Sequence, residues 1–341
     1  MDRRNFLKMT ASIAAGLGVG NKDCFAKAGD VFTSAAFEER PIEAGWVRSV
    51  RSRSVFVARR STPFLSQLDE EIRGTGKGKV ALLWPFFEQV TGHALVPHFQ
   101  EIGDCVSHGF GLGVDILTAV QIIMRRAPQE FRAKTATEII YGGSRVEIGR
   151  SEYDIYFRGD GSTGHLAAEF LKSYGPLLRE VYPGGYDFRE YSGDLAKVLG
   201  KQGVPNPLEP LCKIHPVGCV SLVESYEEYR DCIYNGFPVA LCSSQGFATR
   251  GGRDKDGFLY PSRNPWMHCM LGAGVDDQHK RPGGLIINSW GSNWISGPKR
   301  HDQPEGSFWA DAAVIDRICK QGDSIALSCY AGYPRQDYIL W

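Results

Sequence analysis

The segment Ile286-Ile287-Asn288-Ser289-Trp290-Gly291-Ser292-Asn293-Trp294 decides the fold of this 341-residue chain. Its two isoleucines are typical of a short strand, expected over 285–290, and the same run carries a carboxamide, Asn288. About twenty residues earlier, the apolar run His268–Val275 is another expected strand, and it begins with a histidine. The side-chain oxygen of Asn288 can accept a hydrogen bond from one imidazole nitrogen of His268, which leaves the other nitrogen for chemistry. Trp290 or Trp294 could shield that bond from water.

A cysteine stands where a helix is expected to begin. Apolar residues recur after Cys105 at steps of three or four, and Asp104 is an expected N-cap. These apolar residues are Val106, Phe110, Val114, Leu117, Val120 and Met124. A helix N-terminus lowers the pKa of a thiol because its unpaired N–H groups favour negative charge. Cys105 is therefore a candidate nucleophile, although a cysteine at a helix start is more often structural.

The rest of the chain indicates an α+β fold with helices first and strands later. Further helices are expected from His165 to Tyr174, capped by Ser162 or Thr163, and after Ser225, where Ser225-x-x-Glu228 forms a capping box. Later strands are expected over 238–242, 268–275, 285–290 and 306–309. We expect a helical half over about 100–200 and a β-rich half over about 205–341, meeting at a cleft.

Composition excludes some classes of function. Lys plus Arg and Asp plus Glu both total 39, so there is no overall field to attract nucleic acid. Hydrophobic residues make up 43% of the chain, which is enough for a proper core. Nucleic-acid binding is therefore not expected.

The first 28 residues resemble a twin-arginine export signal. Arg3-Arg4 precedes a mildly apolar run over 9–20, and Ala26-Lys27-Ala28 is an A-x-A cleavage pattern. The alternative is a basic cytoplasmic N-terminus. The apolar run over 9–20 is too short to span a membrane, and no later stretch is expected to span one. We expect the protein to be exported to the periplasm or medium after cleavage near Ala28. That compartment permits disulfides, whose connectivity the spacing does not give.

Residues 29–80 are expected to form an N-terminal extension or linker. A basic cluster, Arg48, Arg51, Arg53, Arg59 and Arg60, precedes the Gly-rich stretch 73–79. A phosphate-binding loop is the alternative for that stretch, but it lacks the G-x-x-x-x-G-K-[ST] spacing. A solvated linker is the favoured interpretation, and no helical inhibitory prosegment pattern is recognisable.

The order Gln100, Cys105, His268, Asn288 resembles that of the papain-like cysteine peptidases, over residues 81–341. The run Asn288-Ser289-Trp290-Gly291 is the most specific part of the resemblance. It implies a helical half bearing the cysteine and a barrel-like β-rich half bearing the histidine, with the active-site cleft between them. The division expected from the residues alone is the same.

The resemblance also implies roles for individual residues. Cys105 would be the nucleophile, paired with His268 as thiolate and imidazolium, and Asn288 would orient the imidazole. Gln100 and the backbone N–H of Cys105 would stabilise the oxyanion. The Gly-rich loop with Gly161, Ser162, Thr163 and Gly164 would pair with an extended peptide through its backbone.

Four positions depart from the family pattern. Ile102 replaces a cysteine commonly found three residues before the nucleophile, and the Gly-rich loop also lacks its cysteine, so the usual disulfide between them is not expected. Gln100 lies five residues before Cys105, one fewer than usual, and Val106 replaces an aromatic residue. These departures indicate a divergent branch.

Other residues offer rival chemistry. His108 is closer to Cys105 in sequence, but we interpret it as a packing or surface histidine without an orienting partner. Cys269 is expected to face away from His268 as a small buried hydrophobe. Cys212, His215 and Cys219, with Cys232 or Cys242, could bind zinc, yet the spacing fits no common pattern and a loop is favoured.

The sequence therefore predicts a cysteine peptidase acting on peptides or proteins, with no cofactor and no metal. A non-catalytic protein of the same fold, used for binding or assembly, is one alternative. Another thiol acyl-transfer enzyme, such as a cell-wall amidase or a transglutaminase-like protein, is a second. Labelling by an epoxide inhibitor of papain-like enzymes separates these cases.

Overall fold

The computed structural model describes residues 45–49, 53–54, 71–124, 130–213, 217–330 and 332–336. The expected export signal over 1–28 and His215 of the zinc alternative lie outside the described residues. The export signal therefore stays a prediction, and the zinc site stays the disfavoured alternative to a loop.

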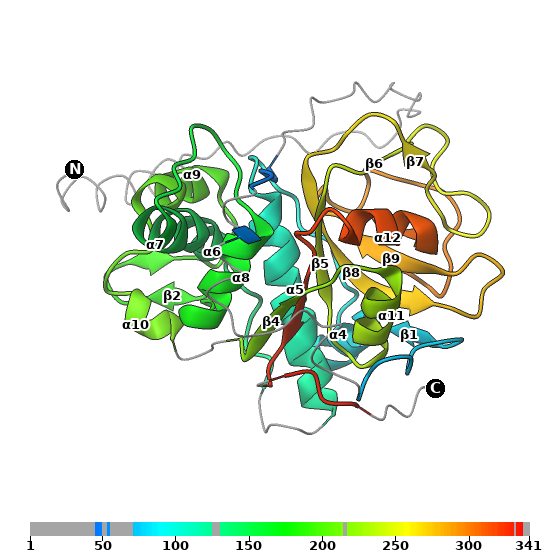
Figure 1. The fold of residues 1–341 in the computed structure, drawn as a ribbon. Helices are drawn as coiled ribbons and strands as arrows, with labels where there is room; N and C mark the ends of the chain where they lie inside the picture. Colours follow the sequence, from blue (N-terminus) through cyan, green and yellow to red (C-terminus); the bar gives the residue numbers. More distant parts are fainter. Residues whose placement is uncertain are drawn as a thin grey trace, which may run out of the picture.

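A seven-stranded antiparallel sheet forms one half of the molecule, on the right of Figure 1. Its strands follow the order β10-β9-β8-β5-β11-β4, and β1 adds to β8. The strands are β1 (Val80–Leu82), β4 (Cys219–Leu222), β5 (Val239–Ser243), β8 (His268–Asp276), β9 (Gly283–Ile287), β10 (Ser307–Asp311) and β11 (Ile325–Ser328). The helices α4 (Trp84–Thr91), α11 (Tyr226–Tyr234) and α12 (Ala312–Cys319) and the hairpin β6 (Gly246–Phe247) with β7 (Pro261–Ser262) complete this half.

Helices form most of the other half, on the left of Figure 1. They are α6 (Thr137–Gly143), the π-helix η1 (Ser144–Arg150), α7 (Ser151–Tyr153), α8 (Gly164–Ser173), α9 (Gly193–Gln202) and α10 (Glu209–Cys212), with a hairpin of β2 (Val181–Tyr182) and β3 (Tyr186–Asp187). The side chains of Thr163 and Ser192 cap α8 and α9. A hydrophobic cluster of this half, with Phe170 and Phe188, is separate from the main core.

The helix α5 (Cys105–Ile123) lies between the halves and packs on both. It is buried nearly all round, because sheet strands cover one side and α6 and α8 cover another. Small residues permit this approach: a Cβ on Gly109 would lie 2.8 Å from Cys269 Sγ, and one on Gly113 would lie 2.8 Å from Leu327. The glycines therefore set how closely α5 lies to β8 and β11.

Elements with a clear pattern are those that the sequence predicts. The helix after Asp104, the helix capped by Thr163 and the helix capped by Ser225 are present, and α8 (Gly164–Ser173) lies within one residue of the expected ends. Ser225 Oγ accepts from Glu228 N, whereas the Glu228 carboxylate accepts from Glu224 N. The strand expected over 285–290 ends at Ile287, so Asn288 follows it.

The interpretation of residues 73–79 as a solvated linker is wrong. They form a turn against α11, where the carboxylate of Asp231 accepts from Gly74 N at 2.7 Å and from Gly76 N at 3.0 Å. The next residues form β1, which pairs with β8. Helices do not simply precede strands, because this early strand belongs to the later sheet.

All eight described cysteines are free thiols. Cys212 and Cys219 lie in two different hydrophobic clusters, which does not suit a shared zinc ion. Among the described residues, α5 is long and apolar enough to span a membrane, contrary to the expectation that no later stretch qualifies. It is mostly buried and forms the core of the fold.

Candidate active site

Asn288 and His268 meet on neighbouring strands. His268 is the first residue of β8, and Asn288 directly follows β9, its antiparallel neighbour. The bond between His268 Nε2 and Asn288 Oδ1 is 2.7 Å long, and both side chains are buried. Asn288 Oδ1 also accepts from Ser289 N at 2.7 Å. This places the carboxamide as an acceptor and fixes the orientation of the imidazole.

Cys105 lies against the same strand. Its Sγ accepts a hydrogen bond from the backbone N–H of Cys269 at 3.3 Å, so the sulfur lies beside the residue that follows His268. The second imidazole nitrogen, His268 Nδ1, is buried and has no hydrogen-bond partner among the described residues. The sulfur therefore lies beside β8 next to His268, and among the described residues no direct bond joins it to the imidazole.

The two tryptophans are arranged in layers over the imidazole. Trp290 stacks on His268, with ring centroids 4.8 Å apart and planes 27° apart. Trp294 contacts Trp290 edge-on at 5.1 Å, and its indole N–H donates to Gly306 O. Trp290 thus covers the face of the imidazole, while Trp294 supports Trp290.

Gln100 is held from two sides. Its Nε2 donates to Ile102 O at 2.8 Å, and its Oε1 accepts from Ser289 Oγ at 2.6 Å. A carboxamide carries two N–H donors, so one remains for a ligand. The backbone N–H of Cys105, at the first position of α5, has no partner inside the helix by its position. Ser289 links Gln100 to Asn288, a role that the sequence analysis missed.

Burial shifts the pKa of both reactive groups in the direction that favours the neutral form. It raises the pKa of the Cys105 thiol well above its ordinary value, and the neighbouring Cys269 and Asp104 act in the same direction. It lowers the pKa of His268 to about 4, against the opposing hydrogen bond from Asn288. Both shifts oppose the expected thiolate and imidazolium pair, because low-dielectric surroundings disfavour both charges.

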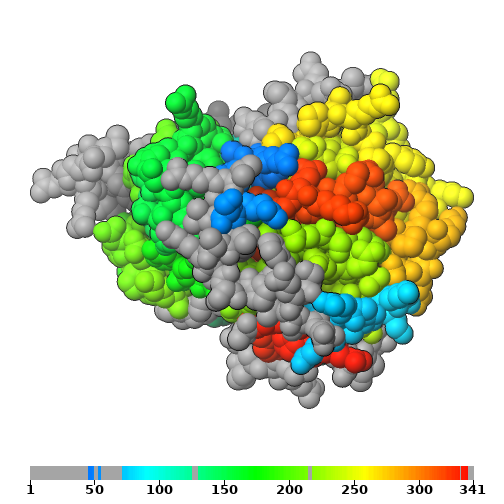
Figure 2. Space-filling view, viewed as in Figure 1, coloured from blue at the N-terminus to red at the C-terminus, as the bar shows by residue number. Residues whose placement is uncertain are grey.

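A segment of the chain itself covers Cys105. A Cβ on Gly45 would lie 2.7 Å from Cys105 Sγ and 2.7 Å from Gly103 O, so only glycine fits there. The N–H groups of Gly45 and Trp46 donate to Met267 O at 3.1 and 2.9 Å. Figure 2 shows the described residues of this region, in blue, between the green helical half and the orange and red part of the other half. We call Gly45–Val47 the covering segment.

The Gly-rich loop pairs with the covering segment. Ser162 N donates to Gly45 O at 3.0 Å, and Val47 N donates to Ser162 O at 2.9 Å, in a parallel bridge. A Cβ on Gly161, whose φ is +106°, would lie 3.0 Å from Gly45 O. Thr163 caps α8, and Gly164 N donates to the carboxylate of Asp323. Gly161 and Ser162 therefore contact the covering segment, while Thr163 and Gly164 build the start of α8.

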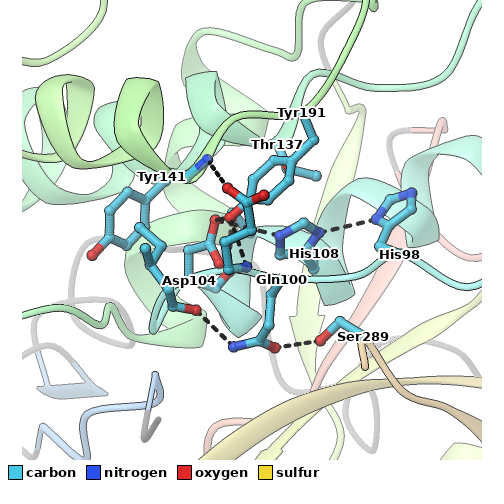
Figure 3. A network of polar contacts seen from close by, with 12 residues as sticks. His98, Gln100, Asp104, His108, Thr137, Tyr141, Tyr191 and Ser289 are labelled. Atoms are coloured by element: carbon cyan, nitrogen blue, oxygen red, sulfur yellow. Dashed lines mark hydrogen bonds and ion pairs between the residues drawn. The ribbon is translucent and has the colours of Figure 1, made fainter. Parts of the chain in front are cut away.

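His108 is a buried member of a polar network, contrary to the expectation that it lacks a partner. Its Nδ1 lies 3.1 Å from His98 Nδ1, and its Nε2 lies 3.3 Å from Asp104 Oδ2. Tyr191 also donates to Asp104 Oδ2, at 2.9 Å. Figure 3 shows this network beside Gln100 and Ser289. Asp104 thus starts α5 without capping it through its side chain.

Cys269 is buried as expected, but it is not remote from the site. Its backbone N–H contacts Cys105 Sγ, and its own sulfur lies against Gly109 of α5. The described residues contain no cluster of His, Cys, Asp or Glu that could hold a metal ion. The chemistry available at this place is that of a thiol, an imidazole and two carboxamides.

Comparison with known proteins supports the fold. Neither the protein-family models nor the curated proteins give a match to the sequence. Among solved structures, xylellain, a cysteine protease from Xylella fastidiosa, superposes with a TM-score of 0.55 at 14% identity, over 86% of this chain and 99% of that chain. Procathepsin B S9 from Trypanosoma congolense superposes with a TM-score of 0.51 at 10% identity, over 86% and 87%. The fold is therefore α+β and papain-like.

Proposed function

We propose that the chain is a cysteine peptidase that cleaves peptide bonds through Cys105, His268 and Asn288. The observation that carries the proposal is the pairing of His268 with Asn288 at 2.7 Å, with Cys105 Sγ against the next residue of the same strand. His268 Nδ1 is left without a hydrogen-bond partner among the described residues. A nucleophile, a base and an orienting group are the parts that thiol acyl transfer needs.

In the proposed reaction, His268 Nδ1 takes the proton of the Cys105 thiol, and the sulfur attacks the scissile carbonyl. The oxyanion forms near the free N–H of Gln100 and the backbone N–H of Cys105, which stabilise charge that develops only in the transition state. His268 then gives its proton to the leaving amine. Water, activated by the same imidazole, hydrolyses the thioester and restores the thiol.

The described state is closed in this proposal. The covering segment lies over Cys105 and pairs with Ser162 and Met267, so a substrate cannot reach the sulfur until the segment leaves. Opening admits water to the groove. Solvation then lowers the pKa of the thiol and raises that of the imidazole toward their ordinary values. The closed state thus blocks both access and activation.

The intact set of polar contacts favours a peptidase over a non-catalytic protein of this fold. Ser289 fixes Gln100 through a 2.6 Å bond and Asn288 through its backbone N–H. A binding protein has no need to hold two carboxamides around a histidine in this way. Export of the enzyme by the N-terminal signal is part of the proposal, and N-terminal sequencing of the exported protein tests it. A mature chain that begins near Ala28 is the expected result, and a chain that keeps Arg3-Arg4 would contradict it.

The activity is tested with the full-length Gly45→Ala protein, in which the groove should be open, under reducing conditions. Its substrates are an unfolded protein and a mixed peptide library, and hydrolysis is measured. Cys105→Ala in this background should lose hydrolysis completely while its circular dichroism stays unchanged. Cys329→Ala removes an exposed free thiol and is the matched control, with full activity expected. Hydrolysis by the Cys105→Ala protein, or none by either protein, would contradict the proposal.

A further inference from the structure

One side chain of the covering segment is buried in the protein, and we call the space that it fills the side pocket. Trp46 is only 2% exposed, and its indole N–H donates to Asp323 Oδ2 at 2.7 Å. The flanking residues Gly45 and Val47 make the two hydrogen bonds to Ser162. The side chain that enters the pocket therefore belongs to the residue held opposite Ser162.

Asp323 is held rigidly at the end of this pocket. Its Oδ2 accepts from Gly164 N at 2.8 Å, and its Oδ1 accepts from His165 N at 2.9 Å, both at the N-terminus of α8. His165 Nδ1 lies 2.9 Å from the same Oδ1. A Cβ on Gly164 would lie 2.7 Å from Asp323 Oδ1, so glycine lets the carboxylate reach the helix end. The position of Asp323 thus does not depend on the occupant of the pocket.

The indole N–H completes the hydrogen bonding of this carboxylate. If another peptide replaces the covering segment, Oδ2 loses a donor in a place that is almost closed to solvent. Oδ2 keeps the bond from Gly164 N, but the loss of a second hydrogen bond to a buried charged group is still costly, so a side chain without an N–H is disfavoured. A phenylalanine would fill the space and leave Oδ2 with one donor, Gly164 N, in place of two.

The pocket also disfavours a charged donor. Trp46 belongs to the main hydrophobic core cluster of the protein, which means that apolar groups surround it. An arginine or lysine would lose its hydration there. The Asp323 carboxylate would compensate for only part of that loss, because it already accepts hydrogen bonds from two backbone N–H groups and contacts His165. A large apolar side chain with one N–H suits both features.

We propose that Asp323 determines specificity and that this pocket selects a tryptophan side chain in the substrate, at the position held opposite Ser162. The inference rests on the proposed peptidase function and names its substrate class. The covering segment fills the groove with the same side chain that the enzyme recognises.

The experiment uses the full-length Gly45→Ala/Trp46→Ala protein, in which the pocket is vacated. Fluorogenic peptides carry Trp, Phe, Leu or Arg at one position at a time. At one position, kcat/KM for Trp should exceed that for Phe by about tenfold or more, as expected for a buried hydrogen bond to a charged group. Adding Asp323→Asn, which preserves the shape of the side chain, should reduce this ratio severalfold, because a neutral acceptor binds the donor less strongly. An unchanged ratio, or a preference for Phe, Leu or Arg, would overturn the inference.

A second measurement does not need catalysis. Iodoacetamide labels Cys105 of the same protein in the presence of acetyl-Gly-Trp-Val-amide or acetyl-Gly-Phe-Val-amide. The Trp peptide should protect the thiol at about a tenfold lower concentration. Equal protection overturns the pocket assignment. If the Trp peptide protects Cys105 selectively but no peptide is hydrolysed, the pocket assignment holds and the peptidase proposal is contradicted. If peptides are hydrolysed without a preference for Trp, the peptidase proposal holds and the pocket assignment is contradicted.

Discussion

Ser289 connects the two carboxamides of the site. Its hydroxyl binds Gln100 Oε1, and its backbone N–H binds Asn288 Oδ1. Asn288 in turn binds His268, so one residue positions both the group proposed to orient the base and the group proposed to bind the oxyanion. These side chains are buried, which makes each hydrogen bond stronger and each lost bond more costly.

Substitutions in this run should therefore have graded effects. Asn288→Ala leaves His268 Nε2 without its acceptor and should lower kcat on the order of tenfold to a hundredfold. Ser289→Ala removes one hydroxyl and should lower kcat by about twofold to tenfold. Asn293→Ala, at an exposed position of the same run, is the control and should leave kcat unchanged. An Asn288→Ala enzyme with normal turnover would speak against an orienting role.

For single residues, the sequence predicts which side chains belong to the candidate site better than it predicts the contacts that they make. Cys105, His268, Asn288 and Gln100 were predicted because thiol chemistry needs these groups, and the structure brings them to neighbouring positions. The contacts of His108 with His98 and Asp104 could not be predicted, because they depend on how the loop before α5 folds back. Nothing in the local pattern around Gly45 indicates that it lies on the sulfur.

Among the elements, α5 and β8 decide the geometry of the site, because one carries Cys105 and the other carries His268. Their separation depends on Gly109, where an added Cβ would lie 2.8 Å from Cys269 Sγ. The sulfur belongs to a buried, short side chain that has little freedom to move away. A larger residue at Gly109 must therefore push the strand from the helix.

Gly109→Ala should lower both stability and activity. Alanine favours the helix by up to about 1 kcal/mol. Overpacking typically costs about 1–3 kcal/mol, so a net loss is expected. Thermal unfolding and kcat measured on the same preparation check this. Gly159→Ala, where an added Cβ meets nothing within 4 Å, should change neither. A Gly109→Ala protein that is more stable and fully active would show that the separation does not matter.

The covering segment makes its own prediction. In Gly45→Ala the new methyl group would collide with Cys105 Sγ and Gly103 O, so the segment should leave the groove. Cys105 should then react with iodoacetamide at least about tenfold faster, because the thiol gains both access and solvation. Peptide mapping by mass spectrometry gives the rate. Gly332→Ala, where an added Cβ would meet nothing within 4 Å, is the control. An equal rate in the two variants and the wild type would contradict the covering role.

Elements with strong local signals were predicted, and those that depend on distant partners were not. The helix after Asp104 shows a clear apolar period, and Ser225 begins a capping box. By contrast, β1 is only three residues long and exists because β8 offers an edge. The turn over 73–79 was interpreted as a linker because its glycines suggest flexibility, whereas Asp231, far along the chain, fixes it.

For the whole molecule, the closed groove couples protonation to stability. The pKa of His268 is lowered to about 4 by burial, while an unfolded histidine titrates at its ordinary value of 6.5. Between these values the unfolded chain binds more protons, so stability is lost as the pH falls from about 6.5 to about 4. The full effect is about 3 kcal/mol for a group buried in this way.

His268→Gln should therefore flatten the acid limb of the stability curve. Urea unfolding of the wild type and the variant from pH 7 to pH 4 gives the difference, in which contributions of other groups cancel. Asp115, whose pKa burial raises to about 6, acts in the opposite direction in both proteins. A difference that does not depend on pH would mean that the imidazole is solvated in the folded protein.

The central claim is that the thiol of Cys105 and the imidazole of His268 act as one unit, and covalent labelling tests it most directly. The full-length Gly45→Ala protein and its His268→Ala derivative are treated with an epoxide inhibitor of papain-like enzymes, and the labelled peptide is identified by mass spectrometry. We predict a label on Cys105, with a rate that falls at least about a hundredfold in the derivative, because the thiol loses its base. A label on Cys269 or Cys329, or an equal rate in both proteins, would contradict the account.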